Sequence, residues 1–344
     1  MKKPSTRATI ADVAKKAGVS VTTVSRAINS KELVNAETYS RILDAMYKLG
    51  YPIPEDANTP AVKKGKRVVI VNTPTAGHAF YHEIFRGITE AANRYGWFVI
   101  LNEEYICESS YKNFITLLTN CNALGLITTN GADRQSLERI SKKFPVIQCI
   151  QMTSPDLPYV GYDDNQAMLS AINYLLSIGH KKIAFLTGSE TSTDENMDSS
   201  KRIIYQRSDI VVQALSAAGV EIDPNFIVDI HGPLHYSFAY NSFSSFLDRG
   251  YRPDAVLGVV DTVAYAAVLA LQDHGFNVPK DCAVIGFDNV SISEMCRPAL
   301  STVSIPRHEI GFYACNMLHS LCINPEDTNI NIQFKTELIL RDST

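Results

Sequence analysis

The sequence predicts an α/β protein in two parts: a short N-terminal unit of three helices, and a larger body of two lobes, each a doubly wound parallel sheet. Three observations indicate this arrangement. Apolar residues recur at helical spacing over residues 9–50. A segment rich in proline and lysine follows at residues 52–66. From residue 67 onward, short apolar runs alternate with amphipathic segments, as in folds built from parallel sheets and crossover helices.

The first fifty residues fit three short helices. Thr9 can cap the first helix, and Gly18 can end it. Ser20 can cap the second helix, and a third fits residues 36–49, with Gly50 as its stop. A helix, a turn containing glycine and a second helix form the helix-turn-helix arrangement, in which the second helix can enter the major groove of DNA.

The outer face of the second helix carries side chains that suit DNA. Arg26 can make a bidentate contact with guanine, and Val21 can contact a thymine methyl group. The hydroxyl groups of Ser20, Thr23 and Ser25 suit phosphates. A helical hairpin with a solvated polar face is the alternative. The residues expected to bind DNA are Thr9, Ser20, Val21, Thr22, Thr23, Ser25, Arg26 and Asn29.

Charge is unevenly distributed along the chain, although the net charge is only −4. Residues 1–67 hold nine lysines and four arginines against six acidic residues, so the rest of the chain is acidic. A basic unit joined to an acidic body favours a polyanion at one end only. A short terminal segment can also be basic by chance, and the charge therefore supports DNA binding without deciding it.

Several classes of protein are excluded by what the sequence lacks. No apolar run approaches the roughly 20 residues that a membrane helix needs, and the N-terminal MKKPSTRATI lacks the apolar part of a signal peptide, so we expect a cytoplasmic protein. The seven cysteines are scattered without a CxxC pair, which indicates reduced thiols and no metal site. Without a GxGxxG, Walker or GxSxG motif, no enzymatic activity and no cofactor are expected.

The body is predicted from its alternating pattern. The expected strands are Arg67–Asn72, Trp97–Leu101, Leu124–Thr128, Val146–Ile150, Tyr159–Tyr162, Lys182–Thr187, Ala255–Val260 and Ala283–Phe287. The expected helices are His82–Tyr95, Ser109–Asn120, Gln166–Ile178, Ile210–Ala218, Ala239–Asp248 and Thr262–His274. In doubly wound lobes ligands bind at the carboxyl ends of the strands, which for two facing lobes is the cleft between them.

The segment Thr9–Arg26, TIADVAKKAGVSVTTVSR, resembles the head of the lactose-repressor/galactose-repressor (LacI/GalR) family of transcription regulators almost residue for residue. Matches continue through the body, including IGFD at 285–288 and PALSTV at 298–303. The resemblance implies a periplasmic-binding-protein-like sensor and a homodimer, most commonly a repressor, that reads a near-palindromic operator. The implied division is a head at 1–51, a linker at 52–66 and a sensor at 67–344, with an N-lobe at about 67–162 and 291–320 and a C-lobe at about 163–290 and 321–344.

The resemblance also implies a small-molecule effector between the lobes. Phe80 and Tyr81 can stack on a sugar ring or a base, Arg207 offers a planar fork of donors, and Asp261 and Asp288 can accept hydrogen bonds. Each also has a purely structural explanation: a core position, a surface ion pair or a helix cap. The residues implied to bind the effector are Phe80, Tyr81, Ile84, Thr129, Asp163, Arg207, Leu234, Asp261 and Asp288.

The sequence says less about the chemical class of the effector and about the structure of the linker. Arg207 with several aspartates favours a sugar, while a nucleoside, a sugar acid or a protein co-regulator stays open. In the linker, Asn58 and Pro60 stand where the family usually has the arginine and the leucine of a hinge helix. Proline disfavours a helix interior. We therefore expect loosely tethered heads, modest operator affinity, tolerance of variable half-site spacing, and phosphate contacts from Lys63, Lys64, Lys66 and Arg67.

Overall fold

The computed structural model describes two compact units, Met1–Gly65 and Lys66–Thr344, and each is considered by itself. The expected hinge segment at residues 52–66 lies outside the described residues. The described residues are 8–29, 34, 38–39, 41–42, 45–46, 49, 51, 67–73, 79–129, 132–188, 199–221, 223–325 and 330–344, with the backbone only at 28–29 and 199–206.

The N-terminal unit contains the two expected helices, α1 (Ile10–Ala17) and α2 (Val21–Asn29). Thr9 caps α1 in a reciprocal capping box with Asp12, and Gly18 ends the helix in the left-handed conformation, at φ 66°. Within the segment expected as a third helix, residues 38–39, 41–42 and 45–46 are helical. Their buried side chains complete one small core, which holds Val13, Ala14, Ala17, Val24, Ala27, Ile42, Ala45 and Met46.

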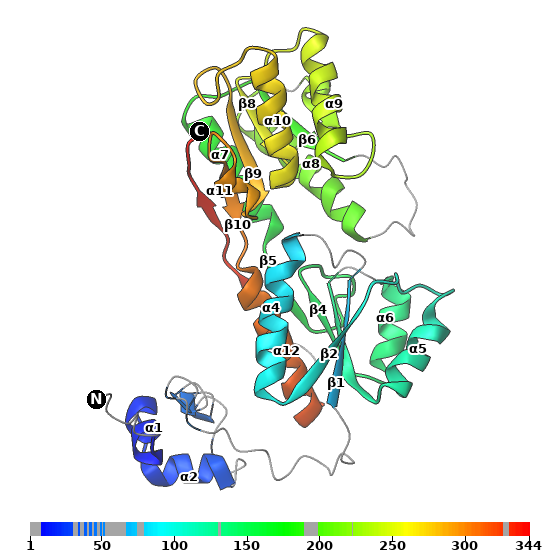
Figure 1. Cartoon of the computed structure of the whole chain (residues 1–344), viewed down its shortest axis with the longest axis vertical. Helices are drawn as coiled ribbons and strands as arrows, with labels where there is room; N and C mark the ends of the chain where they lie inside the picture. The colour runs from blue at the N-terminus through cyan, green and yellow to red at the C-terminus, as the bar shows by residue number, and fades with distance from the viewer. Residues whose placement is uncertain are drawn as a thin grey trace, which may run out of the picture. The chain divides into compact units, whose positions relative to one another are not determined.

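The larger unit contains two sheets of six strands, which form two separate lobes in Figure 1. The first sheet has the order β11-β5-β4-β3-β1-β2. Its strands are β1 (Arg67–Asn72), β2 (Trp97–Asn102), β3 (Ala123–Thr128), β4 (Val146–Cys149), β5 (Tyr159–Tyr162) and β11 (Asn331–Phe334). All of its neighbouring strands pair in parallel.

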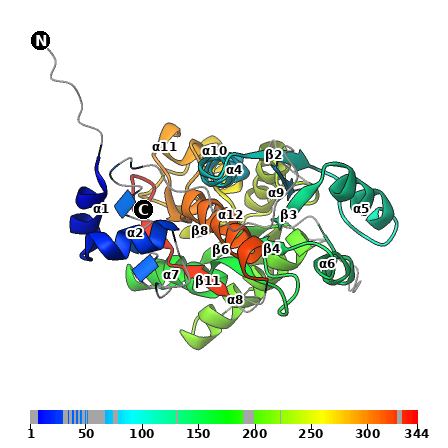
Figure 2. The ribbon, with the colours of Figure 1, turned by 90° about the horizontal axis from the view of Figure 1, so that it is seen from below.

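Helices cover both faces of this first sheet. Val69 and Val71 of β1 share a core with α4 (Ala79–Arg94) and α12 (Arg307–Ile323). Val68 and Ile70 point to the other face, toward α5 (Tyr111–Asn120) and α6 (Arg134–Ser141). Figure 2 shows these two helix pairs on either side of β3 and β4. Because both faces are buried, β1 reads as a continuous apolar run rather than an alternating one.

The second sheet has the order β12-β10-β9-β8-β6-β7 and is parallel except for β12, which runs antiparallel to β10. Helix α7 contacts α8, and α9 contacts α10. Its strands are β6 (Ile183–Thr187), β7 (Ile227–Asp229), β8 (Ala255–Gly258), β9 (Ala283–Asp288), β10 (Ser301–Ser304) and β12 (Glu337–Ile339). Its helices are α7 (Asp164–Ser177), α8 (Ser199–Ala217), α9 (Tyr236–Asp248), α10 (Asp261–Asp273) and the short α11 (Ile292–Met295).

The predicted fold class is confirmed, and every expected strand is present within two residues of its expected bounds. Each helix expected in the body is present too, although α8 is much longer than expected. The prediction omitted α6, α11, α12, β7 and the last three strands. No helix in the described part of the chain is long and apolar enough to span a bilayer.

The division of the chain between the lobes differs from the expected one. Residues 291–320 were assigned to the N-lobe, but β10 pairs with β9 in the second sheet, and only α12 packs on the first. Conversely, β11 pairs with β5 in the first sheet, although residues 321–344 were assigned to the C-lobe. Strand β10 belongs to the second lobe because of contacts with residues far away in the chain. Thr302 of β10 is buried, and its hydroxyl donates to Asp261 of the second lobe, at 2.5 Å. The chain thus passes between the lobes after β5, after β10 and after β11.

Candidate DNA-recognition helix and effector cleft

Helix α2 presents an outward face that suits a major groove. The backbone N–H of Thr23 donates to the Ser20 hydroxyl at 3.0 Å, which caps the start of α2. Val24 and Ala27 are buried against the head core. Val21 is 46% exposed, and Thr22 and Arg26 are also exposed. Because the buried and exposed positions lie on opposite sides of the helix, Val21, Thr22 and Arg26 point away from the core.

The other residues expected to bind DNA have local partners. Thr9 takes part in the capping box of α1. The hydroxyls of Ser20 and Thr23 are 2.8 Å apart and hydrogen-bonded to each other. Ser25 is half-buried, and the side chain of Asn29 lies outside the described residues. Thr9, Ser20 and Thr23 therefore have a structural role at helix starts, and DNA contacts would be additional to it.

In the larger unit, Arg207 of α8 is held at the ends of strands from both lobes. Its guanidinium donates to both carboxylate oxygens of Asp164, at 2.8–3.1 Å. It also donates to the Tyr162 hydroxyl at 3.0 Å and to the Val259 carbonyl at 2.7 Å. The guanidinium carbon lies 3.8 Å from the centre of the Phe287 ring, within the range of a cation–π contact. Only 5% of Arg207 is exposed.

Electrostatics keep Arg207 charged in this buried place. Burial works to lower the pKa of the guanidinium, but the negative charge of Asp164, which also accepts hydrogen bonds from it, raises that pKa further than burial lowers it. The cation is therefore permanent, and the ion pair with Asp164 is a fixed part of the cleft.

Two further acids lie at the end of β9 and the start of α10. Burial raises the pKa of Asp288 to about 8, although Arg207 works against the shift. Burial likewise raises the pKa of Asp261 to about 7, against hydrogen bonds from the Thr302 hydroxyl and the backbone N–H of Val290. Near neutral pH, Asp288 thus holds its proton for much of the time and can either donate or accept a hydrogen bond.

Phe80, Tyr81 and Ile84 lie at the start of α4 and are buried. The two aromatic rings meet edge to face, with centroids 5.1 Å apart. Both rings belong to the large hydrophobic core, which supports a structural role for this pair. Thr129 follows β3, where its backbone N–H donates to the carbonyl of Asn72 at 3.0 Å.

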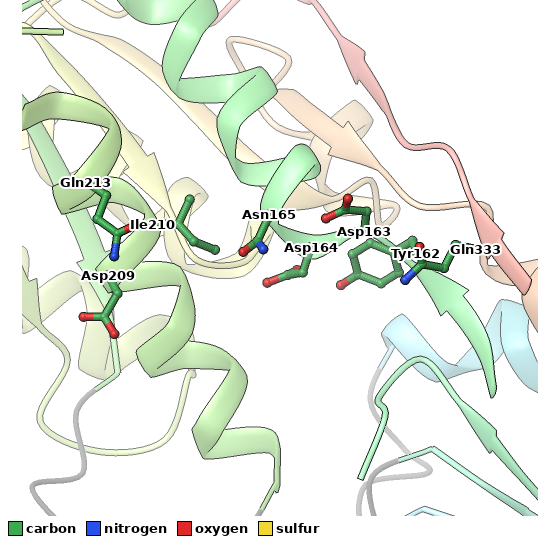
Figure 3. Close-up of a pocket in the computed structure, with 8 residues that line it drawn as sticks. All are labelled: Tyr162, Asp163, Asp164, Asn165, Asp209, Ile210, Gln213 and Gln333. Atoms are coloured by element: carbon green, nitrogen blue, oxygen red, sulfur yellow. The ribbon is translucent and has the colours of Figure 1, made fainter. Parts of the chain in front are cut away.

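A hollow opens beside Arg207, between the start of α7, α8 and the edge of the first sheet (Figure 3). Asp163 lines it and caps α7 by accepting from the backbone N–H of Gln166 at 3.0 Å. Leu234 lies in the loop before α9 and packs half-buried against the core. The hollow is lined by Tyr162, Asp163, Asp164, Asn165, Asp209, Ile210, Gln213 and Gln333.

Comparisons with known proteins agree with both parts of this arrangement. Residues 9–54 match the model described as bacterial regulatory proteins, lacI family, and residues 172–344 match the periplasmic binding protein-like domain. The chain is 30% identical over 346 residues to the transcriptional repressor CytR of Escherichia coli K12, covering 100% of this chain and 98% of the relative. The chain belongs to the lacI family of bacterial regulatory proteins.

Solved structures share the fold of this lacI-family protein. The lac repressor dimer bound to operator and the anti-inducer ONPF gives a TM-score of 0.70 at 23% identity, with 98% of this chain and 99% of that chain covered. The complex of the regulator CelR with cellobiose gives a TM-score of 0.68 at 23% identity, with 98% and 100% covered. These likenesses establish the two-sheet architecture.

Sequence reasoning missed three cleft residues of this lacI-family protein. Asp164 and Tyr162 hold Arg207, yet the sequence showed them only as the end of an apolar run followed by acids. Arg307 was also missed. It starts α12, is 8% exposed and donates to the carbonyls of Phe80, at 3.4 Å, and Asn289, at 2.8 Å. It therefore links an α4 residue of the first lobe to the segment after β9 in the second, and no local pattern signals such a link.

Proposed function

We propose that this lacI-family protein is a repressor that binds a near-palindromic operator as a homodimer and is controlled by a small molecule bound between the lobes of its sensor. The observation that carries the proposal is the outward face of α2, where Val21, Thr22 and Arg26 are exposed while the other face is buried. The printed descriptions of similar proteins support it: CytR is a repressor, and the lac repressor was solved as a dimer on its operator.

A sugar is the effector that the cleft favours. Buried acceptors, a buried guanidinium and an aromatic pair suit a ring that carries several hydroxyl groups. The solved relative CelR holds cellobiose, which supports the same class. A nucleoside would also fit these groups, and a protein co-regulator is the further alternative. The proposed contacts are Phe80, Tyr81, Ile84, Thr129, Asp163, Arg207, Leu234, Asp261 and Asp288.

The acids of the cleft have roles other than catalysis. Asp163 caps a helix and Asp164 neutralises Arg207, so this adjacent pair does not form the paired acid and base of a hydrolase. We therefore propose a regulator without enzymatic activity, working in the cytoplasm where its operator DNA is found.

The DNA-binding proposal is tested by selecting operators from random duplexes and measuring their affinity by fluorescence anisotropy. Loss of a bidentate contact to guanine costs about 1–3 kcal/mol, so Arg26→Ala should bind the selected operator roughly 5- to 150-fold more weakly. Arg134→Ala removes the same charge from an exposed pair in the sensor and should leave the affinity unchanged. Equal affinities of Arg26→Ala and the wild type for all duplexes would contradict the assignment of α2.

Effector control is tested by a thermal-shift panel of sugars and nucleosides, followed by operator titrations with each compound that stabilises the protein. A ligand at about 100 times its dissociation constant adds roughly 2.7 kcal/mol to stability. A compound that both stabilises the sensor and changes operator affinity supports the proposal, because coupling between two sites is reciprocal. Stabilising compounds that leave operator affinity untouched would contradict it.

A further inference from the structure

We infer that the cleft rejects anionic effectors and that Asp164 determines this specificity, which narrows the ligand to an uncharged or amino-bearing compound rich in hydrogen-bond donors. The inference rests on the proposed effector role of the cleft. Arg207 is the cation that would otherwise attract a carboxylate or phosphate, and Asp164 already holds it in an ion pair at 2.8 Å.

The donors of Arg207 are almost fully used. A guanidinium has five N–H groups. The Nε group and one Nη2 group donate to Asp164, the second Nη2 group donates to Tyr162, and one Nη1 group donates to Val259. One N–H group on Nη1 is left. An incoming anion cannot form a bidentate pair with one donor, and it would have to displace Asp164 first.

The neighbouring groups are mostly acceptors. Three of the residues that line the hollow are aspartates, and none of the residues that line it is lysine or arginine. Asp288 is 4% exposed, and no described side chain or backbone group hydrogen-bonds to its carboxyl group. Asp288 ends β9 directly after Phe287, whose ring lies 3.8 Å from the guanidinium carbon of Arg207. It therefore has capacity for a ligand hydroxyl or amine, while the aspartates that line the hollow would repel an anionic ligand.

Arg307 is the other buried guanidinium near this place. It donates to two main-chain carbonyls, and its Nε group has no partner. Burial raises the pKa of Asp261 to about 7 and that of Asp288 to about 8, so near neutral pH both are partly protonated and can donate as well as accept. The fixed negative charge beside Arg207 is that of Asp164. A neutral polyol, an amino sugar or a nucleoside suits these groups, whereas a sugar acid or a sugar phosphate would need the Arg207 charge that Asp164 already neutralises.

The first test uses inorganic phosphate as the probe, so that no effector has to be known. The thermal midpoint of the full chain is titrated with phosphate against chloride of equal ionic strength. The wild type should respond to phosphate no more than to chloride. Asp164→Asn, which frees the Arg207 charge, should bind phosphate at least about tenfold more tightly than the wild type. Asp209→Asn removes the same charge from the hollow without freeing Arg207, and should therefore change phosphate affinity much less than Asp164→Asn does.

Asp164→Glu restores the negative charge and should abolish the response to phosphate, which separates a charge effect from a loss of folding. An equal response of Asp164→Asn and Asp209→Asn would overturn the inference. So would a phosphate response of the wild type that Arg207→Ala abolishes.

The second test compares matched ligands: glucose with glucose 6-phosphate and gluconate, and cytidine with its monophosphate. Tighter binding of any anionic member than of its neutral partner to the wild type would overturn the inference. A gain of at least about tenfold in anion affinity in Asp164→Asn would support it. Operator affinity of the unliganded variants is recorded in parallel. If charge selection fails while operator binding persists, only this inference is lost, whereas loss of specific operator binding by the wild type would overturn the proposed function.

Discussion

Arg207 is a buried cation with one carboxylate partner. The loss in the free energy of unfolding on replacing it therefore depends on the groups that lose their partner. In Arg207→Ala, Asp164 loses its ion pair and the Val259 carbonyl loses a donor. Breaking a buried pair from one side costs about 3–5 kcal/mol, and Asp164 keeps some access to water, at 24% exposure. We therefore expect a loss of about 2–4 kcal/mol in the free energy of unfolding, measured by urea denaturation.

The exposed pair of Arg134 and Glu138 supplies the control for that measurement. Its side chains are 57% and 36% exposed, so solvent screens their attraction. Arg134→Ala should change the free energy of unfolding by less than about 1 kcal/mol. If the two variants lose equal stability, Arg207 is not the buried anchor described above.

Asp288 makes the stability of the folded protein depend on pH. Its pKa is about 8 in the folded protein and 3.8 in its ordinary state, so the folded chain binds more protons than the unfolded chain between these values. Stability contributed by the protonated group is complete below pH 3.8 and is lost as the pH rises through about 8. The thermal midpoint of the wild type should therefore fall between pH 6 and 8.5, and less steeply in Asp288→Asn.

Asp261 titrates in an overlapping range, since its pKa is about 7, and it accounts for a slope that remains in Asp288→Asn. The variant is a mild one, because Asp288 has φ 106° and asparagine tolerates positive φ better than most residues. The same slope in the variant and the wild type would show that Asp288 ionises normally.

At the scale of elements, α4 and α12 pack with their backbones in close contact. A methyl group at Gly87 would overlap the main-chain carbonyl of His308, and one at Gly311 would overlap that of Ile84. Overpacking of this kind typically costs about 1–3 kcal/mol. We expect Gly87→Ala and Gly311→Ala each to lower the free energy of unfolding by that amount, although alanine favours a helix.

Thr89→Ala is the matched control, because Thr89 is exposed on the same helix. It should change the free energy of unfolding by no more than about 0.5 kcal/mol. A stabilising effect of Gly87→Ala in urea denaturation would mean that the two helices lie farther apart than the structure shows.

The sequence predicts those elements whose signal is local. Strands such as β1 and β6 are apolar runs between turns, and helix α4 has one apolar face. Helix α12 was missed because it is buried on several sides and therefore lacks a single apolar face. Strand β10 was missed because its serine and threonine side chains look solvent-facing, whereas Thr302 is buried by a hydrogen bond to Asp261.

The residues of the two candidate sites also divide into those that the sequence predicts and those that it does not. The residues of the exposed face of α2, Val21, Thr22 and Arg26, follow from helical spacing and from the family resemblance. Asp164 and Arg307 do not, because their roles depend on residues far away in the chain: Arg207 for the first, and Phe80 and Asn289 for the second. Sequence patterns describe neighbours along an element, whereas a cleft between lobes is made by the crossovers.

At the scale of the molecule, three crossovers join the lobes and the cleft groups come from both sides of them. Tyr162 ends β5 of the first sheet, and its hydroxyl accepts from Arg207, which belongs to a helix of the second lobe. Arg307 bonds Phe80 of the first lobe and Asn289 of the second. A ligand that competes for either arginine therefore changes contacts that span the lobes. If it binds one arrangement of the lobes more tightly than another, it shifts the equilibrium between them. Such a shift is how the ligand can alter DNA binding by the head.

The linker at residues 52–66 lies outside the described part of the chain, so its expected behaviour rests on its sequence. Pro60 stands where the family usually has the leucine of a hinge helix, and proline disfavours a helix interior. We therefore expect operator affinity to vary by less than about tenfold when the spacer between half-sites is changed by one or two base pairs. Binding should also weaken steeply with salt if the linker lysines contact phosphates.

Pro60→Leu supplies the matched comparison on the same duplexes. It restores the usual residue and removes the main obstacle to a hinge helix, so it should raise affinity for one spacing and reduce tolerance of the others, because a leucine wedged into the minor groove fixes the geometry of the DNA. A wild-type protein that already demands a single spacing in gel-shift titrations, with Pro60→Leu behaving identically, would show that the linker holds the heads in one arrangement despite its proline.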